Sequence, residues 1–100
     1  MNRTLGSLVA LALAPAAAHA QTTSAVEVPG RLLASNCFQC HGTNGSGGFE
    51  RLAGMSSGEI IKEMQEMRLK NPPEMMEVHA RGYTDAQIKL IADYFSKLAR

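Results

Sequence analysis

Two cysteines and a histidine lie within five consecutive positions of this 100-residue chain, in the segment Cys37-Phe38-Gln39-Cys40-His41. This C-x-x-C-H order is the attachment signature of c-type haem. Each thiol can form a thioether with one vinyl group of the porphyrin, so two bonds would fix the position and orientation of the ring. The histidine directly after the second cysteine would lie on one face of the ring and supply the proximal iron ligand. The motif therefore predicts one covalent haem c, attached to Cys37 and Cys40 and ligated by His41.

Three other uses of a C-x-x-C pair compete with haem attachment. A thiol–disulfide redox pair is expected in a βαβ context, and no run typical of a strand surrounds the motif. A zinc site needs two more ligands at matching spacing, but the chain has no other cysteine. A structural disulfide would suit an oxidising compartment. The histidine directly after the second cysteine favours haem over all three.

The second axial position of the iron is a separate question. Methionine raises the potential of haem iron and is the partner of histidine in cytochromes c. Met64 and Met67 follow a helical apolar stripe with Ile60, and methionine at that spacing is more typical of core packing. Met55 lies close to the haem motif along the chain.

A segment near residue 75 holds the stronger candidates for this position. Met75 and Met76 follow a Pro-Pro pair, and we expect residues 74–82 to form a loop that could lay a thioether over the ring. His79 lies in the same segment and is a further candidate. On the residues alone, the choice among Met75, Met76, His79 and Met55 stays open.

The first 20 residues have the parts of a secretory signal peptide. Arg3 precedes an apolar run over residues 8–14, and Ala18-His19-Ala20 is a small-x-small cleavage site. The run is too short to span a bilayer comfortably, so we expect cleavage before Gln21, with no membrane span left afterwards. Export together with the haem motif predicts a periplasmic location.

The charge balance of the chain favours no polyanionic partner. Ten Lys and Arg residues face nine Asp and Glu residues, which gives a formal charge of +1, and cleavage would remove Arg3 and bring it to zero. We therefore expect neither a nucleic-acid partner nor binding to an anionic membrane surface. About 80 residues would remain, which is marginal for a domain without a staple, and a large apolar cofactor would supply the missing core.

The remaining sequence predicts short helices in one domain over residues 29–100, after a flexible N-terminus over residues 21–28. Pro29 and Gly30 open a helix from Arg31 to about Asn36 that runs into the haem motif, since Pro suits the first helical position. A glycine-rich loop follows over residues 42–48.

Capping boxes predict the starts of two further helices. Ser56-x-x-Glu59 begins one that runs to about Lys70, where Asn71-Pro72-Pro73 ends it. Thr84-x-x-Gln87 begins the last helix, which runs to about Leu98. Four residues at helical spacing form the expected buried stripe of this last helix, namely Ile88, Ile91, Ala92 and Phe95.

These features together resemble a class I cytochrome c. The resemblance implies an all-α fold of three to four short helices around one covalently bound haem, in which the first and last helices cross. Gly30 would be the crossing glycine, Leu33 would stand where the family has an aromatic residue, and Tyr94 would be the aromatic residue on the last helix.

A narrower resemblance is to the cytochrome subunit of flavocytochrome c sulfide dehydrogenase. It implies Met76 as the distal ligand, with Met75 as the second choice. Arg81 replaces the lysine of the family pattern, and His79 stands where that pattern has an aliphatic residue. The matching segments are Cys40-His41-Gly42-Thr43-Asn44-Gly45, residues 60–67, and Met76-x-x-x-Ala80-Arg81-Gly82-Tyr83-Thr84-Asp85.

This resemblance implies an electron carrier rather than an enzyme. The chain would accept electrons from the FAD-containing subunit of a sulfide dehydrogenase and pass them to a downstream cytochrome or oxidase, with the catalytic site on the flavoprotein. A free-standing diffusible cytochrome c, or the haem subunit of another periplasmic oxidoreductase, is the alternative. A small-molecule sensor or a peroxidase-like enzyme would need an iron position that opens to a ligand.

Overall fold

The computed structural model describes residues 10–14 and 28–100. The predicted cleavage site, the new N-terminus at Gln21 and nearly all of the predicted flexible stretch 21–28 lie outside these residues. The signal peptide and the domain boundary therefore stay predictions. Among the residues that are described, no helix combines the length and the apolar character needed to cross a bilayer.

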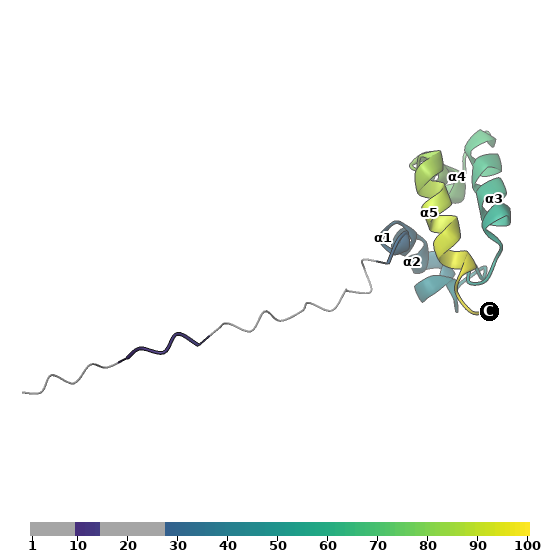
Figure 1. The fold of residues 1–100 in the computed structure, drawn as a ribbon. Coiled ribbons are helices and arrows are strands. Elements are labelled where there is room, and N and C mark those ends of the chain that lie inside the picture. The colour runs from purple at the N-terminus through teal and green to yellow at the C-terminus, as the bar shows by residue number, and fades with distance from the viewer. Residues whose placement is uncertain (1–9, 15–27) are drawn as a thin grey trace, which may run out of the picture.

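The domain is built from helices, with no strand in the described residues (Figure 1). The all-α fold class is therefore confirmed. A helical run passes through the C-x-x-C-H motif without interruption, which carries it beyond the predicted end near Asn36 to His41. In chain order the elements are α1 (Arg31–Ala34), a 3-10 turn (Ser35–Cys37), α2 (Phe38–His41), a 3-10 turn (Thr43–Gly45), α3 (Ser57–Leu69), α4 (Met75–Arg81) and α5 (Asp85–Ser96).

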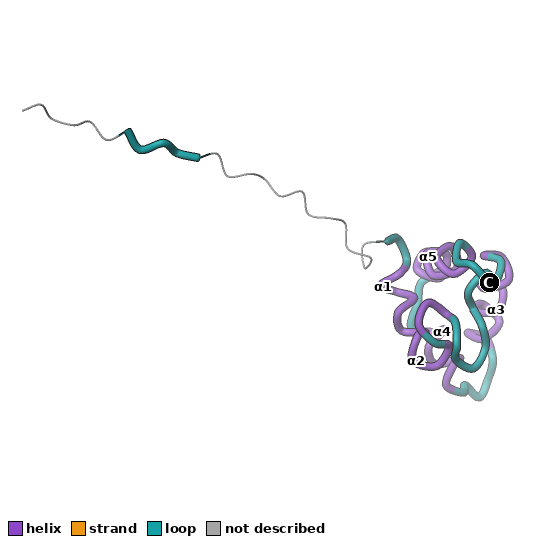
Figure 2. The backbone as a smooth tube through the Cα atoms, turned by 90° about the horizontal axis from the view of Figure 1, so that it is seen from below, coloured by secondary structure: helices purple, strands orange, loops and turns teal. Residues whose placement is uncertain are grey.

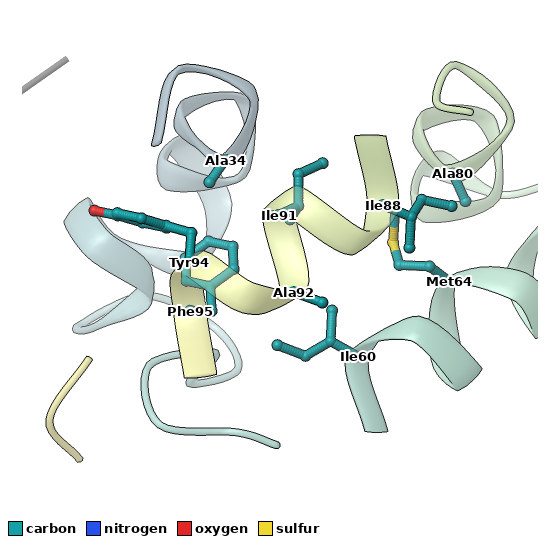
Figure 3. Close-up of a cluster of buried hydrophobic side chains, with 9 residues drawn as sticks. All are labelled: Ala34, Ile60, Met64, Ala80, Ile88, Ile91, Ala92, Tyr94 and Phe95. Atoms are coloured by element: carbon teal, nitrogen blue, oxygen red, sulfur yellow. The ribbon is translucent and has the colours of Figure 1, made fainter. Parts of the chain in front are cut away.

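The last helix, α5, is the centre of the packing. It contacts α1 on one side and α3 on the other, and α3 in turn contacts α4 (Figures 1 and 2). The predicted stripe of α5 is confirmed, because all four of its residues are buried. Figure 3 shows these side chains beside others from three further helices, which are Ala34 of α1, Ile60 and Met64 of α3, and Ala80 of α4.

Side-chain caps begin α3 and α5 where the sequence predicted them. The Ser56 hydroxyl accepts a hydrogen bond from the Glu59 N–H at 3.2 Å, but the return bond from the Ser56 N–H to the Glu59 side chain, which a full capping box would have, is not formed. Thr84 and Gln87 cap each other, with each side chain accepting from the other residue's backbone N–H, at 2.9 and 3.2 Å. Each bond satisfies a donor that the first turn of a helix leaves unpaired.

The prediction of a loop over residues 74–82 is wrong, since most of this segment forms α4. The Glu77 carboxylate accepts a hydrogen bond from the Glu74 N–H at 2.9 Å and stabilises the start of the helix. Glutamate is not among the preferred residues at a helix N-cap, so no local signal marked a helix start at Glu74. The distal ligand candidates consequently lie on a helix.

A polar contact ties the start of α3 to α5. Ser57 donates to one oxygen of Asp93 and Lys89 donates to the other, both at 2.8 Å. The Lys89 ammonium first, and then the Ser57 hydroxyl, hold the pKa of Asp93 below its usual range. The carboxylate therefore stays ionised and fixes α3 beside α5 at neutral pH.

The crossing of the first and last helices, which the family resemblance implied, is confirmed at Gly30. Gly30 directly precedes the first helical residue, Arg31, and its φ is +79°. Pro29, which was expected at the first helical position, therefore lies before the helix. A Cβ atom at Gly30 would overlap the carbonyl oxygen of Leu90 and lie 3.2 Å from the Cβ of Tyr94. Only glycine allows both this backbone conformation and this close approach.

We predict that Gly30→Ala destabilises the protein far more than Gly47→Ala does. Both glycines have positive φ, but a Cβ at Gly47 would meet no atom within 4 Å. Gly47→Ala should lower the free energy of unfolding by about 1–2 kcal/mol, the cost of a left-handed residue. Gly30→Ala should lower the free energy of unfolding by more than this, because its Cβ would also force α1 away from α5. Urea unfolding followed by circular dichroism measures both, and equal losses would contradict the crossing contact.

Candidate haem site

A cavity of about 470 Å³ lies among the helical run of the motif, α3, α4 and α5. Its size is within the range of pockets that hold small molecules and cofactors. Cys37, Cys40 and His41 line it from the motif, and Met75, Met76 and His79 line it from α4. The structure thus brings every residue predicted for the haem site, and the second-choice ligands, to one cavity.

His41 is buried, and a hydrogen bond to a backbone carbonyl holds its ring in place. Its Nδ1 lies 2.7 Å from the carbonyl oxygen of Glu50, which can only accept, so Nδ1–H is the donor. This bond fixes the neutral tautomer with the lone pair on Nε2, which is the form that ligates a metal. A metal-ligating histidine is oriented by such a bond from its other ring nitrogen, so His41 fits the proximal role.

The loop after His41 returns the chain so that Glu50 can accept this bond. Gly42 ends α2 with a φ of +83°, where a Cβ would overlap the carbonyl oxygen of Ser46. The Phe49 N–H then donates to the Cys40 carbonyl at 2.9 Å and closes the loop. The glycine-rich loop predicted here therefore positions the His41 ring.

Both cysteines are free thiols in the structure. Burial raises the pKa of the Cys37 thiol to about 11, whereas Cys40 is exposed. A redox pair needs a thiolate of lowered pKa, so this environment does not favour that alternative. Over residues 10–14 and 28–100 no group of three or more His, Cys, Asp or Glu residues could hold a metal ion, which leaves the zinc alternative without ligands there.

The two neighbouring methionines of α4 differ in burial. Met75 is 69% exposed, whereas Met76 is half-buried and packs against the hydrophobic core. Met64 is also buried in the core, as the helical stripe predicted, although it and Met67 reach the cavity wall together with Met55. Of the candidates on α4, Met76 is the one whose position is set by packing.

Two arginines hold α4 in place, a role that was predicted for neither of them from the sequence. Arg68 at the end of α3 donates to the Ala80 carbonyl at 3.3 Å, to the Asp85 carboxylate at 2.6 Å and to the Tyr83 carbonyl. Arg81 at the end of α4 donates back to the carbonyls of Arg68 and Lys70, at 3.2 and 2.8 Å. No local pattern marks these residues, because their acceptors are backbone carbonyls brought close only by the fold.

Further polar contacts fix both ends of α4. Glu77 is buried, and Lys70 lies 3.4 Å from its carboxylate. Its own backbone N–H, then that of Glu74, and Lys70 hold the pKa of Glu77 below its usual range against the opposing effect of burial. At the other end, the Asn36 amide beside the motif donates to the Tyr83 hydroxyl at 2.9 Å.

The chemistry of these side chains fits a haem. The cavity offers an imidazole with a free Nε2, thioethers on a separate helix, and two thiols at the spacing that porphyrin vinyl groups require. Core residues such as Ile60, Ile91 and Phe95 supply apolar wall. This donor set is typical of a site for one-electron transfer rather than for hydrolysis or group transfer.

Comparison with known proteins agrees with this site. Over 77 residues the chain is 33% identical to the cytochrome subunit of sulfide dehydrogenase from Chlorobaculum tepidum, and the match covers 74% of this chain and 70% of the relative. The chain belongs to the family of this cytochrome. Membership implies a haem cofactor and the role of an electron-transfer subunit rather than of a catalytic enzyme. No protein-family model and no solved structure matches the chain.

We predict that Arg68→Ala loosens α4 and lowers the free energy of unfolding by about 2–3 kcal/mol, since hydrogen bonds from a charged group to backbone carbonyls are lost. Lys62→Ala is the matched control, because Lys62 and its partner Glu66 are both largely exposed on the same helix. The control should change the unfolding free energy by no more than about 1 kcal/mol. If denaturant unfolding shows the same small loss for both, Arg68 does not anchor α4.

Proposed function

We propose that this protein is a periplasmic, mono-haem c-type cytochrome of class I that acts as the electron-transfer subunit of a flavoprotein sulfide dehydrogenase. It takes electrons from the FAD-containing partner and passes them to a downstream cytochrome or oxidase. The observation that carries the proposal is the cavity that joins the C-x-x-C-H motif to Met76, with His41 oriented by Glu50. The likeness to a sulfide dehydrogenase subunit supports the choice of partner.

Four side chains would hold the cofactor. Cys37 and Cys40 would form the thioethers through their sulfur atoms, His41 would ligate the iron through Nε2, and Met76 would ligate it through Sδ. The haem, when bound, supplies one-electron chemistry at its iron. The chain's own contribution is to fix these ligands and to surround them with apolar side chains, because ligand identity and burial set the potential.

The second axial ligand decides between electron transfer and chemistry at the iron. Ligation from both sides leaves no position for a small molecule, which suits a carrier and not a sensor or a peroxidase-like enzyme. The half-buried position of Met76 on a helix anchored at both ends supports this arrangement. Oxidation of sulfide would therefore occur on the flavoprotein partner.

Purification of the native protein from the periplasm tests the proposal. We expect a mature chain beginning at Gln21 whose mass includes one haem, eluting together with a stoichiometric flavoprotein. A colourless chain without the added mass would overturn the haem assignment. A haem protein that always elutes alone would overturn the partner and leave a diffusible cytochrome c.

A pair of neighbouring substitutions tests the distal ligand. We predict that Met76→Ala abolishes the weak long-wavelength absorption band of methionine-ligated ferric haem and lowers the reduction potential, because a thioether ligand raises it. Met75→Ala should leave the band and the potential unchanged, since that side chain is largely exposed. The opposite pair of results would assign the iron to Met75.

A further inference from the structure

A histidine, whose imidazole can ligate haem iron, lies about one turn beyond Met76 on α4. We propose that His79 is a reserve distal ligand, whose imidazole binds the iron when the Met76 thioether leaves it. This proposal rests on the proposed function, because it requires a haem in the cavity and Met76 as the resting ligand. It goes beyond that function by assigning a role to a residue outside the resting ligand set.

The spacing of the two residues allows the exchange. Met76 and His79 are three positions apart on α4, so their side chains project from the same face of the helix. Both line the cavity. An imidazole Nε2 also lies more bonds from its Cα than a thioether sulfur does, which offsets part of the shift of His79 along the helix relative to Met76.

His79 also has room to stay away from the iron while Met76 is bound. It lines a neighbouring groove of about 400 Å³ together with Asn36, Val78, Gly82 and Tyr83. Its side chain is exposed, and its ring takes part in none of the hydrogen bonds found within residues 28–100. The ring therefore stands between two spaces and can turn from the groove into the cavity without breaking a polar contact.

The anchors of α4 keep both donors close to the site during the exchange. Glu77 and Lys70 hold the beginning of the helix, and Arg68 and Arg81 hold its end. Rotation of the two side chains on the anchored helix would then replace one donor by the other. With a haem bound, the Nε2 lone pair of His79 would take the place of the Met76 Sδ lone pair on the iron, one donor for one donor, with no transfer of a proton or an electron.

Met76→Leu tests the proposal in the full chain, produced in a host that matures c-type cytochromes. Leucine keeps the apolar volume of the half-buried side chain but cannot ligate iron. We expect loss of the methionine band, a low-spin bis-histidine signature in electron paramagnetic resonance, and slow carbon monoxide binding. Met76→Leu combined with His79→Phe should be high-spin and bind carbon monoxide rapidly. His79→Phe alone is the matched control and should keep the spectrum of the unaltered protein.

The outcomes separate this proposal from the proposed function. A high-spin Met76→Leu protein would overturn the reserve ligand and leave Met76 as the resting ligand. A low-spin state that persists in the double variant would also overturn it, because another group would be bound. Retention of the methionine band in Met76→Leu would overturn the Met76 assignment and this proposal with it. If Met76→Leu yields too little haem protein, Met76→Ala gives the same readouts with more space for the imidazole.

Discussion

The space enclosed by the helices is the constraint on which the rest of this fold depends. Packed interiors keep few voids larger than a water molecule, whereas the helices here surround about 470 Å³ lined by core residues such as Phe95 and Ile91. A chain of this size cannot build a large core from its own side chains. A flat apolar cofactor in that space would therefore be part of the core, and its binding would be inseparable from stability.

Backbone carbonyls position both sides of the candidate site. On the proximal side, Glu50 orients His41, and on the distal side the carbonyls of Ala80 and Tyr83 bind Arg68. Carbonyls move only with the chain that carries them, so these contacts transmit the rigidity of the helices to the ligands. The crossing at Gly30 adds a third rigid contact. It sets the direction in which the helical run of the C-x-x-C-H motif packs against α5.

Local signals explain which parts of this structure could be predicted from sequence. The caps at Ser56 and Thr84 and the apolar stripe of α5 depend on residues within a turn or two of one another, and all are confirmed. The seven residues of α4 were missed, because so short a helix is not stable on its own and owes its stability to partners elsewhere in the chain. Asn36 and Tyr83, which join the motif to the turn after α4, are 47 positions apart.

The same distinction separates the two faces of the proposed haem. The proposed proximal ligand, His41, directly follows the second cysteine of the motif, so no rearrangement of the fold can part the two. The distal donor is fixed only by tertiary contacts, through a short helix held by Arg68 and Arg81. Substitutions far from the proposed iron site could therefore change the distal donor and would leave the cysteines of the motif in place. The reduction potential of the proposed haem protein would then depend on contacts of α4, with the C-x-x-C-H motif unaltered.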